Sequence, residues 1–463
     1  MSSRRITIIT TQLMGLGHAG GVAAATAHLA IALARSGHDV DIRYTQEQPH
    51  QSLDPEWAGL FDRVGVTIRQ PPALSAPVDP PYFARLRAVD LALRADPPDV
   101  VIAHEYGAPA YISLRLRQLG LAFANTLFVV YCHGTGRWLK DVTGNMRISA
   151  EMLSHVRLEQ AGVELADIVL SPSAYMIDWM RGQGWRLPQV RVVPLVTRAT
   201  ALGEPPPVQP GVDGARPVER LVFFGWLHAV KGVELFAGAL NALEPELLEG
   251  VEVEFLGGPS KNWDPDRVAA LISQRTTRAL RSLSFETGLG QQDALARLGR
   301  PGTLAVMPSR AENSPNVVYE CLEERIPFRA STAGGIAELV ASEDRPRVLF
   351  PPTVEGVSDA LRRALADDEA LRPVRPAFDG ADVLQAWREV VAMPVEGVAR
   401  GVEAPAVDVV VQEHGPADAC LRALDAQSYE RVNVIRAATR AEGLRAGTAE
   451  WVIFLDGADV PQP

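Results

Sequence analysis

The stretch TLAVMPSRAENSPNVVYECLE, residues 303–323, contains the change from strand to helix on which the fold depends. Its apolar start predicts a buried strand that includes residues 304–307. Ser314 is expected to cap a helix that begins at Pro315, because serine favours the cap position and proline the first helical position. The stretch therefore predicts a strand, a turn that contains Glu312, and a helix that contains Glu320.

The same succession of elements recurs on both sides of this stretch. Helix-like segments such as residues 21–37, which end at Gly37, separate most of the strand-like ones. The strand-like segments are residues 5–10, 39–44, 99–105, 126–134, 166–173 and 190–195, and then 220–226, 251–258, 282–288, 303–309, 327–331 and 347–352. This alternation predicts an α/β protein with two doubly wound parallel sheets.

Two segments rich in proline and glycine divide the chain. The expected parts are a Rossmann-like domain at 1–197, a linker at 198–218, a second Rossmann-like domain at 219–393, a linker at 394–406 and a small segment at 407–463. The pattern of the small segment is strand, helix, strand, strand. At about 60 residues it is too short to hold an active site of its own.

The overall composition limits the possible partners. The chain has 463 residues, of which 47% are hydrophobic and 22% charged, which suffices for two or three domains with cores. A formal net charge of −11 and an isoelectric point near 5.4 exclude a typical nucleic-acid-binding protein. An anionic substrate must then be bound by local N–H groups and a few cations.

The cysteines and the apolar stretches bear on the compartment. Cys132, Cys321 and Cys420 form no paired motif, which favours a reducing cytoplasm over a disulfide framework or a zinc site. The N-terminal apolar run is interrupted at residues 10–12 and predicts a strand instead of a signal peptide. The stretch 121–132 is too short to span a bilayer. We expect a cytoplasmic protein, with peripheral contact at the inner membrane face left open; the sequence does not indicate an oligomeric state.

The two glutamates of the opening stretch flank a helix start. Unpaired N–H groups and the positive end of the helix dipole suit a phosphate. Glu312 and Glu320 lie on either side of this position and suit hydroxyl groups, such as those of a sugar.

Two glycine-rich loops follow predicted strands. Residues 15–20 match the dinucleotide pattern G-x-G-x-x-G, but four residues separate the pattern from its strand. The alternatives are a flexible loop in which Gly20 and Gly21 let a ligand approach the backbone, or a plain turn of small residues. Gly334 and Gly335, with Glu338 after them, repeat the order of strand, glycine loop and helix.

Further candidates follow other strands. His133 ends a strand at the edge where α/β sheets bind ligands, although it equally suits a structural cap. Trp226 and Lys231 follow the first strand of the second domain, where a lysine either binds a diphosphate or is an ordinary surface residue. Asp456 and Asp459 suit a divalent cation or a polar loop. The sequence contains no order of residues typical of a hydrolase and no metal-ligand cluster.

The segments VFFGWLHAVKGVELFAGAL, LAVMPSRAENSPNVVYECL and ASTAGGIAELV resemble the donor domain of retaining glycosyltransferases of family 4, which have the two-domain GT-B fold. Glu312 and Glu320 match the family motif E-x7-E. The resemblance covers residues 5–393. It implies a nucleotide-sugar donor bound in a cleft between two Rossmann-like domains, and transfer of the sugar to a hydroxyl acceptor with retention and without a metal or other cofactor.

The resemblance also implies roles for individual residues. Glu320 would bind the ribose hydroxyls and Glu312 those of the donor sugar. His133 would face the donor sugar. The diphosphate would contact Lys231 and the backbone of Asn313, Ser314, Pro315 and Asn316, while Gly20 and Gly21 would lie near the phosphate and the acceptor.

The sequence departs from the family in one important position. Trp226 replaces an arginine that would pair with Lys231 on the diphosphate, and Arg310 is a candidate substitute. Loss of one charge-assisted contact of about 1.5–3 kcal/mol corresponds to a ten- to hundred-fold slower transfer. Residues 407–463 resemble the start of a family 2 glycosyltransferase with a GT-A fold, and we expect this segment to be inactive alone.

Other functions remain as alternatives. One is a sugar-nucleotide-binding protein or scaffold in which Trp226 has impaired transfer. The others are a Rossmann oxidoreductase, and an epimerase or phosphorylase with the GT-B fold.

Overall fold

The computed structural model describes most of the chain in two compact units. Residues 1–114 and 125–395 belong to one unit, and residues 115–124 and 396–463 belong to the other. The described residues are 3–16, 20–45, 52–72, 74, 81–144, 149–203, 217–367, 369–395, 406–412, 417–427, 431–449, 451–457 and 459.

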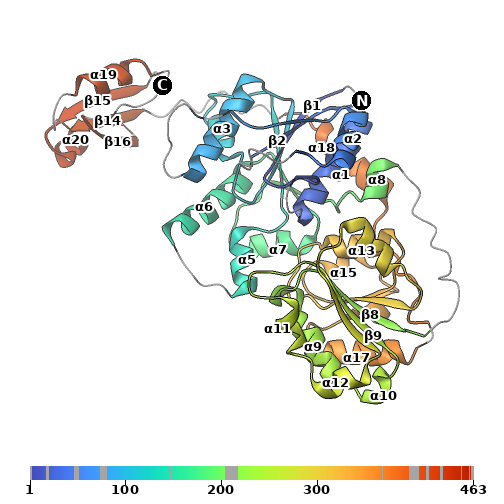
Figure 1. The fold of residues 1–463 in the computed structure, drawn as a ribbon. Coiled ribbons are helices and arrows are strands. Elements are labelled where there is room, and N and C mark those ends of the chain that lie inside the picture. Colours follow the sequence, from blue (N-terminus) through green and yellow to red (C-terminus); the bar gives the residue numbers. More distant parts are fainter. Residues whose placement is uncertain are drawn as a thin grey trace. The chain divides into compact units, whose positions relative to one another are not determined.

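The first sheet of the larger unit is parallel throughout its described part (Figure 1). Its strands are β1 (Arg5–Thr10), β2 (Asp39–Tyr44), β3 (Thr67–Arg69), β4 (Val100–His104), β5 (Leu127–Tyr131), β6 (Ile168–Ser171) and β7 (Gln189–Val192). The strand order is β3-β2-β1-β4-β5-β6-β7, so the direction of winding reverses between β1 and β4. Every residue of β4 and β5 is buried, as expected for parallel strands covered by helices on both faces.

The second sheet of this unit repeats the design. Its strands are β8 (Arg220–Phe224), β9 (Glu252–Leu256), β10 (Ser282–Glu286), β11 (Thr303–Met307), β12 (Phe328–Ser331) and β13 (Leu349–Phe350). They are parallel in the order β10-β9-β8-β11-β12-β13, and the winding reverses between β8 and β11. Each sheet thus has a point where a crevice opens at the carboxyl ends of its strands.

Helices connect and cover these strands. Along the chain, those between the start of β1 and residue 203 are α1 (Gly21–Arg35), α2 (Pro55–Val64), α3 (Pro81–Ala95), α4 (Tyr111–Gln118), α5 (Gly136–Thr143), α6 (Ala150–Leu165), α7 (Ala174–Gly182) and α8 (Arg198–Leu202). Those that follow are the 3-10 helix η1 (Ala229–Lys231), α9 (Val233–Ala242), α10 (Pro245–Leu248), α11 (Pro265–Ala269), α12 (Gln274–Ala279), α13 (Gln291–Leu298), α14 (Asn316–Glu323), α15 (Ile336–Leu339), α16 (Arg345–Val348) and α17 (Val354–Leu365). Among the helices that the structure describes, none combines the length and apolar composition needed to cross a membrane.

The last helix of the larger unit, α18 (Gly380–Ala392), packs against the first sheet. Its buried Trp387 lies edge-on to Tyr131 of β5, with 5.2 Å between ring centroids. Arg4 donates a hydrogen bond of 3.1 Å to the backbone oxygen of Met393. The chain therefore returns to its N-terminal part after completing the second sheet, a contact that the sequence pattern did not indicate.

The second unit contains a parallel sheet in the order β15-β14-β16. Its elements are β14 (Val407–Gln412), α19 (Asp418–Asp425), β15 (Val432–Ala437), α20 (Arg440–Ala446) and β16 (Trp451–Asp456). The expected order of strand, helix, strand, strand is wrong because it omits α20. Thr439 caps that helix by accepting a hydrogen bond of 3.2 Å from the backbone N–H of Glu442.

The α/β class and the two parallel sheets are confirmed, and two further local expectations, on a helix start and on a strand, are wrong. Helix α14 begins at Asn316, one residue later than predicted. Residues 345–348 form α16, so the strand expected at 347–352 is reduced to Leu349–Phe350. Residues 198–202, expected to be linker, form α8. The three cysteines are free and buried in the described structure.

Candidate functional site

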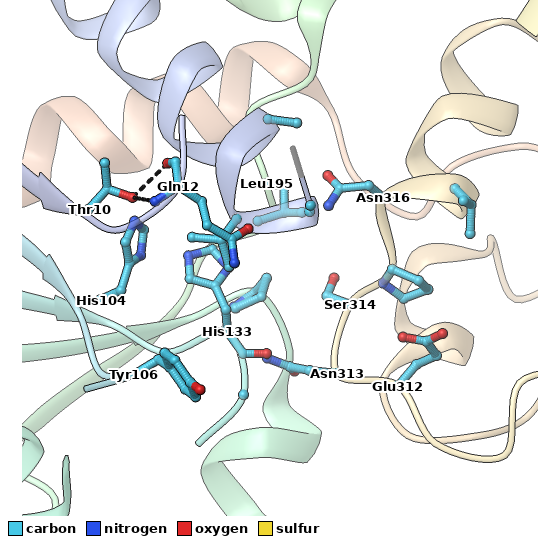
Figure 2. A pocket seen from close by; sticks show the side chains of 18 of the residues that line it. Thr10, Gln12, His104, Tyr106, His133, Leu195, Glu312, Asn313, Ser314 and Asn316 are labelled. Atoms are coloured by element: carbon cyan, nitrogen blue, oxygen red, sulfur yellow. Dashed lines mark hydrogen bonds between the residues drawn. The ribbon is translucent and has the colours of Figure 1, made fainter. Parts of the chain in front are cut away.

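A pocket of about 630 Å³ lies where the carboxyl ends of the two sheets face each other. Its walls contain residues that follow β1, β4, β8 and β11, the four strands that flank the two reversals of winding. Ligands of doubly wound sheets bind at this edge, and the volume suits a small organic molecule. Figure 2 shows residues of the first sheet on one side of the pocket and Glu312 to Asn316 on the other.

The loop after β1 forms one wall of the pocket. Thr10 Oγ1 donates a hydrogen bond of 2.7 Å to the backbone oxygen of Gln12. Gly20 and Gly21 both line the pocket. A Cβ atom on Gly21 would lie 2.3 Å from Nδ2 of Asn316, so a larger residue would displace that side chain at the start of α14. The G-x-G-x-x-G motif is not tested, since residues 17–19 lie outside the described part.

His133 lies in the loop after β5 and is held by its backbone. Its N–H donates hydrogen bonds of 2.9 Å to both carboxylate oxygens of Glu105. Its ring contacts those of His104 and Tyr131, at centroid distances of 4.7 and 4.5 Å. Burial, together with His104, lowers the pKa of His133 well below 6.5, so the imidazole is neutral. Its Nε2 atom is buried without a hydrogen-bond partner in the described structure, and the residue lines the pocket.

Two buried carboxylates support the loops beneath His133. Glu105 accepts backbone hydrogen bonds from His133 and Gly134, and burial raises its pKa to about 7. Glu159 accepts hydrogen bonds from the backbone of Gly107 at 3.0 Å and of Gly136 at 2.8 Å. Burial raises the pKa of Glu159 as well. These carboxylates use their oxygens to bind the backbone of the loops, which makes them positioning groups.

Glu312 and Lys231 form an ion pair in the opposite wall. Lys231 Nζ lies 2.5 Å from Glu312 Oε1. The same oxygen accepts a hydrogen bond of 2.8 Å from Ser309 Oγ. The side chain of Glu312 is 9% exposed, whereas that of Lys231 is 30% exposed. A ligand that enters this wall thus meets a cation that is partly neutralised but still accessible.

The start of α14 also lines the pocket. Pro315 occupies the cap position, and no side chain caps the helix. Ser314 does not cap it because its hydroxyl lies 2.9 Å from the hydroxyl of Tyr319. The first N–H groups of an uncapped helix are free to bind an anion. The helix is eight residues long and points this end into a pocket that also contains Lys231.

Glu320 lies one helical turn further into α14. Gln291 Nε2 donates a hydrogen bond of 2.6 Å to Glu320 Oε1. Burial raises the pKa of Glu320 to about 6. Glu320 lines the same pocket, and a hydrogen bond from a hydroxyl group of a ligand to its carboxylate would favour the ionised form.

Asn313 joins the two halves of the larger unit. Its amide donates to the backbone oxygens of Cys132 and His133, at 3.2 and 3.0 Å. Its Oδ1 accepts a hydrogen bond from Ser173 Oγ. Glu338 makes a parallel link, because its carboxylate accepts from the backbone N–H groups of Ala174 at 2.7 Å and Tyr175 at 2.9 Å at the start of α7. The loop that carries Glu312 is thereby fixed relative to His133.

Trp226 lies at the edge of the pocket after β8 and is 46% exposed. Its ring faces Gly258, where an added Cβ would lie 3.9 Å from the indole. Arg310, the proposed substitute for the missing arginine, pairs with Glu234 at 3.6 Å and is not among the described residues that line the pocket.

Gly334 and Gly335 do not line the pocket in the described part of the chain. They pack behind the loop of Glu312 and Asn313. A Cβ on Gly334 would lie 1.7 Å from the backbone oxygen of Glu312, and Gly334 has φ +59°. The structure therefore assigns both glycines to support of that loop, not to ligand contact.

The structure brings His133, Lys231, Trp226, Glu312, Glu320, Gly20 and Gly21 together with residues 313–316. Sequence reasoning missed the supporting residues, namely Gln12, His104, Glu105, Tyr106, Glu159 and Gln291. Glu105 directly follows a buried strand, a position that signals the ligand-binding edge. Gln291 carries no comparable signal, because its contact with Glu320 joins residues 29 positions apart.

Comparison with known proteins gives matches along both halves of the larger unit. The family model described as Glycosyltransferase Family 4 matches residues 19–196. The model described as Glycosyl transferases group 1 matches residues 218–367. Glycogen synthase of Mycobacterium tuberculosis is 26% identical over 438 residues, which cover 86% of this chain and 96% of the relative.

Solved structures resemble the same part of the chain. Sucrose-phosphate synthase of Thermosynechococcus elongatus has a TM-score of 0.59 at 18% identity and is covered over 96% of its length. HepE of Anabaena, solved in complex with UDP, has a TM-score of 0.54 at 16% identity and is covered over 99%. Each match covers 84% of the present chain.

Proposed function

The chain belongs to the glycosyltransferases with the GT-B fold, and we propose that it transfers a sugar from a nucleoside diphosphate to a hydroxyl acceptor with retention of configuration. The acceptor class comprises glycans, lipid-linked sugars and small molecules. The donor would bind in the pocket between the two sheets, and no metal ion is required in this proposal. Location in the cytoplasm remains a prediction.

The single observation that carries the proposal is the arrangement around the start of α14. Its uncapped N–H groups suit a phosphate, with Lys231 beside them and Glu312 and Glu320 on either side. Glu320 would accept the ribose hydroxyls and Glu312 those of the donor sugar. HepE, which shares the fold, binds UDP.

Departure of the nucleoside diphosphate is the difficult step, because negative charge develops on the leaving oxygen. We infer that Lys231 leaves Glu312 in part and turns toward the diphosphate, while the N–H groups of α14 stabilise the same charge. Release of Glu312 would free its carboxylate for the sugar hydroxyls. In the free protein, the ion pair thus holds Lys231 and Glu312 close to the positions where they would contact the donor.

His133 lines the pocket and would contact the donor sugar with its neutral ring. Glu105 is engaged by backbone N–H groups, and Glu312, once Lys231 has left it, would bind the hydroxyls of the donor sugar. We therefore propose attack by the acceptor on the face from which the diphosphate leaves, without an enzyme nucleophile. Detection of a covalent sugar adduct on the protein would contradict this route.

Impaired transfer remains a second candidate, and Trp226 is the observation that favours it. An indole occupies the edge of the pocket, while Arg310 is paired elsewhere. The protein would then bind a sugar nucleotide without transferring it at a useful rate.

The stereochemical part of the proposal is tested by NMR of the first product. The protein is incubated with a nucleotide sugar of known anomeric configuration that it binds, and the configuration of the released or transferred sugar is followed with time. Retention is expected in the earliest spectra. An inverted first product would refute the retaining mechanism but not the assignment of the donor pocket.

A further inference from the structure

A second pocket of about 880 Å³ lies apart from the first, where the chain passes between its two sheets. Its walls come from α8, from the second half of α14, from residues 372–376 and from the start of α18. Nothing in the proposed transfer uses this pocket.

The acidic groups of this pocket are already engaged. Glu323 accepts a hydrogen bond of 2.5 Å from the backbone of Ala199 and thereby caps α8. Asp379 accepts one of 2.7 Å from the backbone of Ala381 at the start of α18. Each carboxylate keeps its charge, but one of its oxygens is already used at the start of a helix.

Of the three arginines that line the pocket, one is paired with a carboxylate and two are not. Arg375 is bound by Asp344, with a distance of 3.1 Å from its Nε to Oδ2. Arg325 and Arg372 are exposed and form no side-chain ion pair within the described ranges. Arg325 has φ +54°, a left-handed backbone conformation, two residues after the end of α14. The guanidinium groups of Arg325 and Arg372 therefore have N–H donors that no carboxylate occupies in the described structure, and such groups bind phosphate through paired N–H donors.

The floor between these arginines is apolar. Leu322, Phe378 and Leu384 line it together with the ring of Tyr319. The centroids of the Phe378 and Tyr319 rings are 5.1 Å apart. A ligand that fits would combine an anionic group with a body that packs on aromatic rings, such as a sugar ring or an aromatic ring.

We propose that this second pocket binds a small phosphate-bearing metabolite, with the phosphate on Arg325 and Arg372 and the body on Phe378. Occupation is transmitted to the first pocket through Tyr319. The Tyr319 hydroxyl lies 2.9 Å from Ser314 Oγ, in the loop that precedes α14, and accepts a hydrogen bond of 3.1 Å from the backbone of Leu195. A ligand that packs against Phe378 restricts the neighbouring ring of Tyr319, and thereby stabilises the loop that contains Ser314.

The effect on nucleotide binding should be favourable. Residues of α8, α14 and α18 line the pocket, so a ligand bound there contacts all three helices. Such a ligand favours the arrangement of the two sheets that a nucleotide in the first pocket also favours. Coupling between two sites is reciprocal and is usually about five-fold or more in affinity. We expect nucleotide affinity to rise about five-fold when the second pocket is saturated.

Phenyl phosphate serves as the probe, because it combines a phosphate with a ring. Calorimetry on the full chain should detect its binding, and more weakly that of inorganic phosphate. The variant Arg325→Asn/Arg372→Gln removes both charges, and asparagine suits the left-handed backbone at 325. It should weaken phenyl phosphate at least ten-fold. The matched control Arg275→Gln/Arg278→Gln removes two exposed arginines from α12 and should leave binding unchanged.

Nucleotide titrations on the same samples separate the possible failures. Nucleotide binding without phenyl phosphate binding would overturn this inference and leave the proposed function intact. Phenyl phosphate binding that a saturating nucleotide abolishes, or that survives the double substitution, would place the probe elsewhere and also overturn it. Unchanged nucleotide affinity in the presence of bound phenyl phosphate would overturn the transmission through Tyr319.

Discussion

The substitution Asn313→Asp tests whether the link across the cleft positions the donor loop. Aspartate has nearly the same shape as asparagine, but it replaces the amide donor with a carboxylate oxygen. That oxygen would face the backbone oxygens of Cys132 and His133, which now accept hydrogen bonds of 3.2 and 3.0 Å. Asn313 is 3% exposed, so water cannot readily replace these bonds.

The expected magnitude follows from those two contacts. Each hydrogen bond contributes about 0.5–1.5 kcal/mol, and a buried acceptor left unpaired costs about 1–3 kcal/mol. A combined loss of about 2–4 kcal/mol in the assembled cleft corresponds to a decrease of kcat/KM of about 30- to 900-fold. Ser173→Ala removes the bond to Asn313 and also the cap of α7, to which Met176 N–H donates at 3.2 Å. The cap bears on the stability of α7, and loss of the single bond to Asn313 should cost about 1 kcal/mol in kcat/KM, or about five-fold.

The assay is release of nucleoside diphosphate from the sugar nucleotide that the protein binds, with kcat and KM measured separately. Urea unfolding and circular dichroism establish that both variants are folded. If Asn313→Asp is folded and retains kcat/KM within three-fold of the wild type, the link does not position the loop.

Three further predictions concern single residues of the same region. Trp226→Arg should change kcat/KM by less than about three-fold if the native protein is an active transferase; a gain of ten- to hundred-fold, the worth of one charge-assisted contact, would instead support the impaired binding protein. Glu320→Gln should stabilise the free protein by about 2 kcal/mol at pH 7, because burial raises the pKa of Glu320 from 4.5 to about 6 and so penalises the ionised carboxylate. In urea unfolding this gain in stability should vanish below pH 4.5, where the carboxyl group is protonated in both the folded and the unfolded state. An equal gain at both pH values would contradict this cause. Gly334→Ala should destabilise the protein by about 2–4 kcal/mol, because its Cβ would collide with the backbone oxygen of Glu312. Gly21→Ala meets only the end of the Asn316 side chain, so it should cost less than about 1 kcal/mol of stability while it weakens nucleotide binding. Similar urea midpoints for the two variants would contradict this difference.

Local patterns were sufficient to predict most of the fold. Strands such as Arg5–Thr10 and Thr303–Met307 are short apolar runs bounded by turns, and alternation with helices implies parallel sheets. Where local rules compete with tertiary contacts, the prediction failed. Serine is a favoured helix cap, but the hydroxyl of Ser314 forms a hydrogen bond with the hydroxyl of Tyr319, and the helix starts at Asn316. Helix α20 was missed although Thr439 and Glu442 have the spacing of a capping box.

The candidate site was predictable in its residues but not in their pairing. The spacing of Glu312 and Glu320 and the position of Lys231 after a strand are visible in the sequence. The ion pair between Lys231 and Glu312 spans 81 positions, and the bond from Asn313 to His133 spans 180. Such contacts depend on how two sheets meet, which no local pattern specifies. For the same reason Gly334 and Gly335 were assigned to the ligand when they support the loop beside it.

The central claim, that the pocket at the start of α14 binds a nucleoside diphosphate, is tested most directly by calorimetry with UDP, GDP, ADP and dTDP. NAD serves as the control ligand, a chelator is present, and Glu320→Ala is titrated beside the wild type. We predict that one nucleoside diphosphate binds without added metal, that NAD does not, and that Glu320→Ala weakens binding at least ten-fold. If none of the four binds, or if the affinity is the same in Glu320→Ala, the donor site is not where we place it.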